Sequence, residues 1–205
     1  MTLYAKTIIS MCTIAGLAAC GGSSTSNNGG AMGGGGGGFV FENKADFEAL
    51  QDLTTFEFTP AADVPGTADY AGFVQISSLD NAVPAIVGTE AVGVANFAVD
   101  LSGLGTFTGS ATDFQDQAGT YTGTLDITSG GVGPDTISPS ATIAMGEIDG
   151  VLTRETGEVI VIDGAVEGRF FGDGGEMLVG GTGDATGTVD GTAGDIEISI
   201  HGQLQ

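Results

Sequence analysis

Apart from its 26 acids, this 205-residue sequence has few side chains of the types that carry catalysis or bind metals. His201 is the one histidine, so a multi-histidine metal site would need groups that the chain lacks, and a Ser-His-Asp triad would have to use this residue. Its place on the polar side of an alternating segment predicts a solvated surface histidine. Two acidic pairs, Asp163 with Glu167 and Glu155 with Glu158, have the residue types of a glycoside hydrolase. Such pairs arise by chance among 26 acids, and no tryptophan offers a sugar platform, so we expect no enzyme activity.

The remaining charged motifs are weak signals for a site. Residues 180–184, followed by Asp190 and Asp195, have the glycine and aspartate composition of calcium repeats, but their spacing is irregular. We therefore predict no metal site and leave calcium as an open question. Arg154, in the turn over residues 153–157, is predicted to be a solvated hairpin tip. Arg169, beside a pair of phenylalanines, is predicted to neutralise a neighbouring acid.

Cys20 is the residue with the clearest chemistry. It follows Leu17-Ala18-Ala19 at the end of an apolar run over residues 7–17, and Lys6 precedes that run. The run has the length of a signal-peptide core and is too short to span a bilayer as a helix. This order of charge, apolar run, small residues and cysteine resembles the lipobox of bacterial lipoproteins, which implies cleavage before Cys20 and its acylation. An ordinary secretory signal peptide with an incidental cysteine is the alternative.

The charge and cysteine content limit the partners and the source of stability. Removing residues 1–19 takes away Lys6 and no acid, so the net charge moves from −22 to about −23. Phosphate backbones repel such a chain, which argues against nucleic-acid binding, whereas cationic proteins suit it. Cys12 leaves with the signal peptide and Cys20 is acylated, so no thiol remains for a disulfide. Stability must come from a hydrophobic core, for which residues 39–205 are long enough.

The chain after residue 19 divides into a tether, a lead-in and one larger domain. Residues 20–38 join the lipidated cysteine to a Gly/Ser-rich stretch, which predicts a disordered tether with an end-to-end distance of roughly 20–25 Å. In the lead-in, residues 39–63, Asn43 is a predicted N-cap for a helix over residues 44–53. Phe47, Leu50 and Leu53 are spaced three apart, and we expect this apolar stripe to pack against the domain.

From residue 67 onward the hydrophobic period changes to two. Residues 120–127 and 196–204 alternate apolar or glycine positions with polar ones, which predicts strands with one buried face. The predicted strands cover residues 67–76, 92–101, 106–113, 120–127, 141–148, 159–171, 177–189 and 196–204. Glycines inside these strands, namely Gly72, Gly109, Gly123, Gly164 and Gly168, are expected where the sheet bends or two backbones approach closely.

About eight consecutive strands with no helix between them predict an all-β fold. The expected architecture is an antiparallel up-and-down β-barrel over residues 64–205, preceded by one short helix, because closure removes exposed edges. A two-sheet sandwich is the competing architecture. A membrane-embedded barrel is disfavoured, because Asp126 and Glu197 lie on the outer face and the chain has three tyrosines and no tryptophan for interfacial girdles.

Two glycine- and aromatic-rich segments stand out in the predicted barrel. Residues 66–73 read Gly-Thr-Ala-Asp-Tyr-Ala-Gly-Phe, and residues 167–176 read Glu-Gly-Arg-Phe-Phe-Gly-Asp-Gly-Gly-Glu, continuing to Gly-Gly-Thr at residues 180–182. The first resembles the opening strand, and the second the barrel motif, of the β-barrel domain of transferrin-binding protein B and its relatives. Asp173 replaces a proline of that pattern and Gly175 an alanine, and the stretch after residue 181 is atypical. The resemblance covers residues 64–205.

The resemblance implies an outer-membrane lipoprotein, at the cell surface or on the periplasmic face, that binds host iron proteins, complement regulators or haem-containing proteins. This chain has one barrel and almost no handle domain, so transferrin binding itself is not expected, and no binding residue of the family carries over.

We expect a monomeric binding protein without a cofactor, attached to the lipid bilayer through acylated Cys20, that captures a protein or haem-type ligand at the loops of one barrel mouth. A structural or protective surface lipoprotein with no small ligand is the alternative. A barrel filled by Ile160, Ile162, Val166 and Ile198 would favour that alternative.

Overall fold

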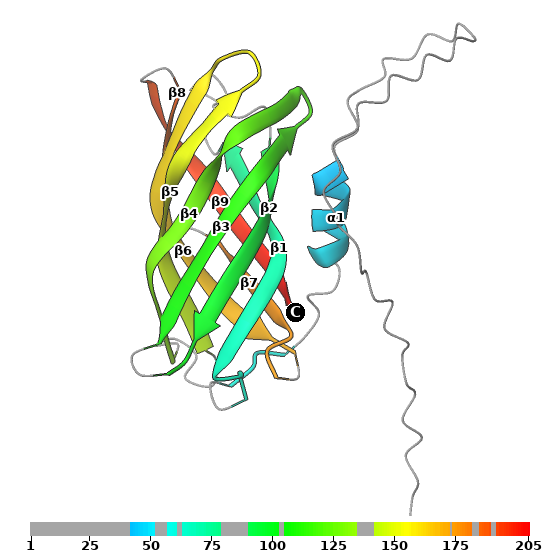
Figure 1. The fold of residues 1–205 in the computed structure, drawn as a ribbon, viewed down its shortest axis with the longest axis vertical. Helices are drawn as coiled ribbons and strands as arrows, with labels where there is room; N and C mark the ends of the chain where they lie inside the picture. The colour runs from blue at the N-terminus through cyan, green and yellow to red at the C-terminus, as the bar shows by residue number, and fades with distance from the viewer. Residues whose placement is uncertain are drawn as a thin grey trace, which may run out of the picture. The chain divides into compact units, whose positions relative to one another are not determined.

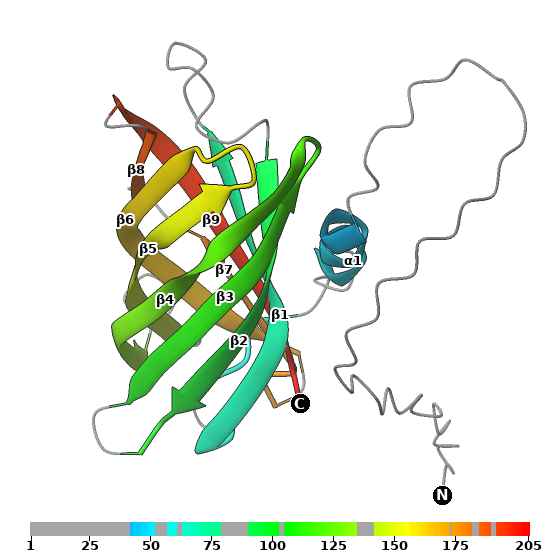
Figure 2. The same cartoon turned by 45° about the horizontal axis from the view of Figure 1, so that its top comes forward.

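The alternating segments form one closed antiparallel β-barrel with a short helix beside its wall (Figure 1, Figure 2). The computed structural model describes residues 42–51, 57–60, 63–78, 90–102, 105–134, 142–172, 174–181, 185–189 and 192–205. All of them belong to one compact unit, Gly37–Gln205. The predicted signal peptide, Cys20, the tether and Leu53 lie outside the described residues.

From β1 to β7 each strand pairs with the next one along the chain, as in a meander, whereas β8 pairs with β6 and β9. The elements are α1 (Glu42–Gln51), β1 (Thr67–Ser78), β2 (Glu90–Asp100), β3 (Thr106–Asp116), β4 (Gly119–Pro134), β5 (Thr142–Arg154), β6 (Val159–Phe171), β7 (Met177–Gly181), β8 (Ala185–Val189) and β9 (Thr192–Leu204). Pairing of β1 with β9 closes the barrel. Both β7 and β8 lie between β6 and β9, so the closed barrel has eight strand positions.

The predicted single strand over residues 177–189 is wrong. It is two strands, because the inward positions change from even to odd numbers: Leu178 is buried in β7, whereas Ala185 is buried in β8. The register against β6 moves by one residue at the same place, from Glu167 opposite Gly181 to Gly164 opposite Ala185. An extra residue of this kind interrupts a ladder as a β-bulge does. The other strands were predicted correctly, with several longer than expected.

The lumen of the barrel is its hydrophobic core. Each strand contributes apolar side chains to one buried cluster, and the four residues named as fillers, Ile160, Ile162, Val166 and Ile198, are all at most 2% exposed. Further large, fully buried side chains fill the space around them: Tyr70, Phe107, Phe114, Phe170, Ile76, Leu125, Ile148 and Leu152. The inner face is therefore occupied by the protein's own side chains.

A substitution at Ile198 tests the assignment of inward-facing residues in β9. Its side chain is fully buried in the core cluster, so Ile198→Ala should lower the free energy of unfolding by about 2–4 kcal/mol through lost apolar contacts and a residual cavity. Chemical denaturation followed by circular dichroism measures the change. Glu197→Ala, at the neighbouring exposed position, is the control and should stay within about 0.5 kcal/mol of the wild type. Equal effects at the two positions would contradict the inward placement of Ile198.

Helix α1 is held against the outside of the barrel. It packs on β1, β2 and β9 and buries Phe47 and Leu50, as the apolar spacing predicted. The predicted N-cap role of Asn43 is wrong, because the helix begins at Glu42 and Asn43 lies in its first turn. Its Nδ2 instead donates to the carbonyl oxygens of Val92, at 3.1 Å, and Asp113, at 2.8 Å.

The Asp113 carbonyl is available to the helix because of a local irregularity in β3. Asp113 has a φ of 55°, and the pairing registers of β3 with both β2 and β4 shift around it. A bulge of this kind turns a carbonyl out of the ladder. Lys44 adds a second attachment through a 2.6 Å ion pair with Glu90 of β2. No helix among the described residues is long and apolar enough to cross a membrane.

Candidate binding surface

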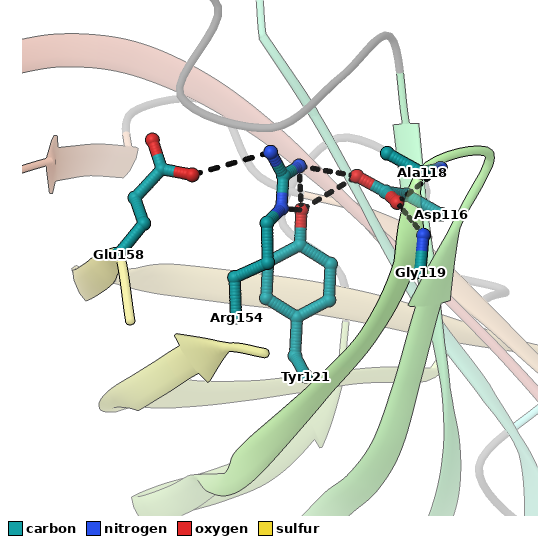
Figure 3. Close-up of polar contacts among 6 residues, drawn as sticks. All are labelled: Asp116, Ala118, Gly119, Tyr121, Arg154 and Glu158. Atoms are coloured by element: carbon teal, nitrogen blue, oxygen red, sulfur yellow. Dashed lines mark hydrogen bonds and ion pairs between the residues drawn. The ribbon is translucent and has the colours of Figure 1, made fainter. Parts of the chain in front are cut away.

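A polar cluster connects two turns at one end of the barrel, the end that is uppermost in Figure 1. Asp116, at the end of β3, is 1% exposed, and its Oδ1 accepts hydrogen bonds from the backbone N–H groups of Ala118, at 2.7 Å, and Gly119, at 2.9 Å. Its Oδ2 accepts from the Tyr121 hydroxyl at 2.6 Å and from the Arg154 guanidinium (Figure 3). The β3–β4 turn is thereby joined to β5.

Arg154 is the centre of this cluster, and the prediction of a solvated hairpin tip is wrong. Its side chain is 18% exposed, pairs with Asp116 and, at 3.2 Å, with Glu158, and lies over the Tyr121 ring with its Cζ 5.0 Å from the centroid. Tyr121 belongs to the buried core, so the polar cluster adjoins the apolar lumen at this end. We interpret it as a structural seal, because its polar groups are already satisfied by one another.

The surroundings shift the pKa values of Asp116 and Tyr121, the two side chains that Arg154 contacts in this cluster. Burial would raise the pKa of Asp116, but hydrogen bonds from Tyr121 and Ala118, the positive charge of Arg154 and the Gly119 N–H together hold it below its ordinary value. Burial, and then the hydrogen bond to Asp116, raise the pKa of the Tyr121 hydroxyl. Asp116 is therefore the ionised acceptor and Tyr121 the donor at neutral pH.

The opposite end has a corresponding tyrosine. The Tyr70 hydroxyl donates to the carbonyl oxygen of Gly175 at 2.8 Å and so attaches β1 to the β6–β7 turn. Burial raises the pKa of Tyr70 to about 12, which keeps this donor protonated. Gly175 has a φ of 77° and is buried in the turn. A buried tyrosine hydroxyl therefore donates a hydrogen bond near each end of the filled lumen.

His201 lies on the outer face of β9, as predicted, but it is not solvated. Helix α1 covers it: the Phe47 ring meets the imidazole edge-on with centroids 4.9 Å apart, and the residue is 7% exposed. Its register neighbours, Phe73 on β1 and Val179 on β7, carry no charge. Its Nδ1 has no hydrogen-bond partner among the described residues. Burial in these apolar surroundings lowers the pKa of His201 to about 4.

This burial predicts a loss of stability in weak acid. Below pH 6.5 the unfolded chain binds a proton at His201 that the folded protein does not bind until about pH 4, so stability falls across that interval by roughly 3 kcal/mol in all. Urea denaturation at several pH values measures the slope, and His201→Gln should remove this part of it. Because the chain has one histidine, the difference between the two slopes belongs to this residue. Identical slopes would contradict a buried neutral imidazole.

The two acidic pairs are not brought together as catalytic pairs. Asp163 and Glu167 lie on the outer face of β6, about 13 Å apart along the strand by the ordinary rise per residue. Glu167 forms a 2.8 Å ion pair with Arg169, which confirms the prediction that this arginine neutralises an acid. Glu155 accepts a hydrogen bond from Thr120, and Glu158 pairs with Arg154. In the described part of the chain, no group of three or more acids, histidines or cysteines is arranged to hold a metal ion.

A groove of about 540 Å³ lies on the outer wall over β6 and β7 and is the candidate binding surface. Val179 and Gly181 of β7 line it opposite Arg169 and Glu167 of β6. Two aromatic rings border it: Phe58, which is 45% exposed, and Phe171, with centroids 4.8 Å apart. We call this surface the Phe58 groove; it is lined by Phe58, Glu167, Arg169, Phe171, Val179, Gly180 and Gly181.

Backbone hydrogen bonds hold Phe58 in place. It forms an antiparallel bridge with Phe171, and the adjacent Thr59 N–H donates to the Phe170 carbonyl at 2.9 Å. The Thr59 hydroxyl donates to the Gly172 carbonyl at 2.6 Å, and Thr59 is itself buried. An exposed aromatic side chain on an ordered backbone loses little conformational entropy on binding, which suits it to recognition.

Sequence reasoning missed Phe58 because it stands in the lead-in, outside any alternating segment. The only available signal was an aromatic residue followed by threonine and proline, which is too common to identify a site. Arg169 was singled out as the partner of a neighbouring acid and as part of a barrel motif, and Phe171 only as part of that motif. The mouth loops were expected to carry the ligand, and the loops over residues 79–89 and 135–141 lie outside the described residues.

Comparison with known proteins adds no assignment for this site. A scan against models of known protein families finds no match, and no curated protein matches the chain.

Proposed function

We propose that this protein is a non-enzymatic, lipid-anchored binding protein of the outer membrane, with a barrel of the transferrin-binding protein B-like type, that captures its ligand on its outer wall. The filled lumen and its two hydrogen-bonded ends favour a rigid scaffold over a container. The observation that carries the proposal is the Phe58 groove, where exposed aromatic surface is held on an ordered backbone.

The groove suits a flat apolar group flanked by polar ones. Phe58 and Phe171 offer ring faces, and the Arg169–Glu167 ion pair offers both a donor and an acceptor at the rim. Aromatic contacts of this kind dominate the energetics of small binding surfaces. An aromatic side chain of a partner protein and a haem-type ring both present such a group, so the two ligands share this recognition chemistry.

Two binding experiments with the detergent-solubilised full-length protein test the proposal. The first titrates the protein with haemin, the flat apolar probe. The second immobilises the protein and identifies the envelope or medium proteins that it retains. Phe58→Ser should abolish whichever interaction the wild type shows, and Val94→Ser, at an equally exposed apolar position on β2, should preserve it. Equal loss in both variants would mean that the groove has no special role.

The structural or protective surface lipoprotein is the second candidate function, and the filled lumen is the observation that favours it. This second function predicts that neither binding experiment detects a ligand. If the wild type retains neither haemin nor any protein, and deletion of the protein changes only the integrity of the envelope, this second function replaces the first.

The anchor has its own test. Cys20→Ala should shift the protein from the detergent phase to the aqueous phase, or leave it unprocessed, because the acyl chains on Cys20 are the proposed membrane attachment. Phase partitioning with a mass measurement reports both outcomes. Cys12→Ala, in the segment that is cleaved away, is the matched control and should partition like the wild type. A processed Cys20→Ala protein that still enters the detergent phase would refute the lipoprotein assignment.

A further inference from the structure

Exposed apolar side chains gather on the outer face of β5 and β6. Among the described residues, four of the six most exposed large apolar side chains lie there: Met145, Val151, Val159 and Val161, each 38–50% exposed. Single exposed apolar residues are ordinary, but a contiguous set marks an interaction surface. These four side chains on two adjacent strands therefore mark a candidate interaction surface.

Three of these residues form a continuous patch near the turn between β5 and β6, which we call the valine face: Val151, Val159 and Val161. Val151 lies directly opposite Val161, and Val159 lies opposite Thr153 in the next row. Threonines continue the patch sideways, with Thr124 opposite Val151 and Thr188 opposite Val161. Since opposed side chains in a sheet are about 5 Å apart, these side chains touch one another.

Beside the valine face runs a row of like charges, which we call the aspartate row: Asp126, Asp149 and Asp163. Asp149 lies opposite Asp126 on one side and opposite Asp163 on the other, and all three are exposed. Like charges placed directly opposite destabilise a sheet. Lys44 and Arg154 pair with other acids, so neither relieves this repulsion.

We propose that the valine face and the aspartate row together are a docking surface for a protein partner that presents apolar side chains next to lysine or arginine. The proposal rests on the proposed function, in which the ligand binds outside the barrel, and gives that function a partner chemistry. Apolar contact would come from the valine face, and the partner's cations would neutralise the aspartate row, whose repulsion disfavours the unbound state.

Two features favour a protein over other occupants. The barrel is closed, so a partner has no free strand edge to extend and must dock on side chains. The three aspartates are not part of any arrangement of described residues that could hold a metal ion, so the complementary charges are those of side chains. Strand preference accounts for valine at outward positions, but it disfavours aspartate, and so it does not account for the row.

The size of the surface suits the centre of an interface. It covers β4, β5, β6 and β8, which at about 4.8 Å between strands is roughly 15 Å across. A stable complex covers about 800 Å² on each partner, so the flanking threonines and the Arg154–Glu158 turn would form the rim. Polar rims of this kind surround apolar centres in ordinary interfaces.

Site-specific photo-cross-linking of the full-length protein in intact cells tests the surface. A diazirine amino acid replaces Val151 or Val161, and Thr108, exposed on the outer face of β3, is the control position. We expect one discrete protein adduct from both valine positions and none from Thr108, with lysine or arginine near the cross-linked residue of the partner. Equal adducts from Thr108, or an adduct with a second copy of this chain, would overturn the proposal.

The charge requirement is tested in the same cells. Asp149→Asn with Asp163→Asn should reduce the adduct at least tenfold, whereas Asp69→Asn with Glu197→Gln makes the same change in net charge on β1 and β9 and should reduce it less than twofold. The first pair should raise the melting temperature by relieving repulsion, so a lost adduct does not report unfolding. Equal reduction by the two pairs would overturn the role of the aspartate row.

A diazirine at position 58 separates this proposal from the proposed function. An adduct at position 58 without adducts at Val151 and Val161 refutes the docking surface and leaves binding at the Phe58 groove intact. Absence of adducts at all three positions, with no retained haemin or protein, refutes both.

Discussion

Arg154→Met should lower the free energy of unfolding by about 3 kcal/mol, because it removes the only cation of the cluster that faces the buried carboxylate of Asp116. Methionine keeps most of the side-chain volume, so the decrease in the free energy of unfolding measures the contribution of the positive charge and its hydrogen bonds. The Tyr121 hydroxyl and the two backbone N–H groups still bind Asp116, which limits the loss. Urea denaturation at pH 7 measures the change.

Acid sensitivity is the second readout of the same variant. The pKa of Asp116 is held below its ordinary value, so the stability that its ionised form contributes is present above about pH 4 and is lost as pH falls through the lower, folded-state pKa. Without Arg154 the pKa of Asp116 rises towards its ordinary value, so less stability is left to lose in acid and the unfolding free energy of the variant falls less steeply below about pH 4. Glu155→Gln, an exposed acid in the same turn, is the control and should change stability by less than about 1 kcal/mol. A similar loss in the control would contradict the central role of the Asp116–Arg154 pair.

Gly123→Ala should lower the free energy of unfolding by at least about 3 kcal/mol. Gly123 has a φ of 122°, which L side chains rarely adopt, and an added Cβ would lie 2.0 Å from the carbonyl oxygen of Val151. Neither β4 nor β5 can relieve this contact without breaking the ladder between them, because Gly123 stands opposite Leu152 in continuous register. Chemical denaturation measures the effect.

The matched control lies in the same strand. At Gly133 an added Cβ meets nothing within 4 Å, so Gly133→Ala should stay within about 1 kcal/mol of the wild type and can raise stability by restricting the unfolded chain. If Gly123→Ala and Gly133→Ala have the same effect, the close approach of β4 and β5 is not what requires glycine at position 123.

The strands could be predicted because burial in a barrel wall follows the local period of the chain. Residues 159–171 were predicted as one strand, and β6 has the same bounds. In residues 196–204 the isoleucines were predicted to share a buried face, and Ile196, Ile198 and Ile200 all lie in the core cluster. Since successive side chains point to opposite faces, one alternating stretch already specifies which residues meet inside.

The environment of the outward residues could not be predicted in the same way. His201 alternates as a polar-face residue should, yet Phe47, which covers it, is 154 positions away in the sequence. Arg154 occupies a turn that is solvated in most hairpins, but it meets Asp116 from a different hairpin. Alternation assigns a side of the sheet and contains no information about which distant element covers that side.

Hydrophobic period and composition were enough to predict an all-β chain of about eight strands, the inward set of each strand and a strongly acidic surface. They did not predict which acids and cations pair, that α1 buries His201, or that Phe58 borders a groove over β6 and β7. Nor did they predict that three aspartates from separate strands align beside the exposed valines. These features depend on register and docking between segments distant in the chain, where the interacting atoms are neighbours only after the barrel closes.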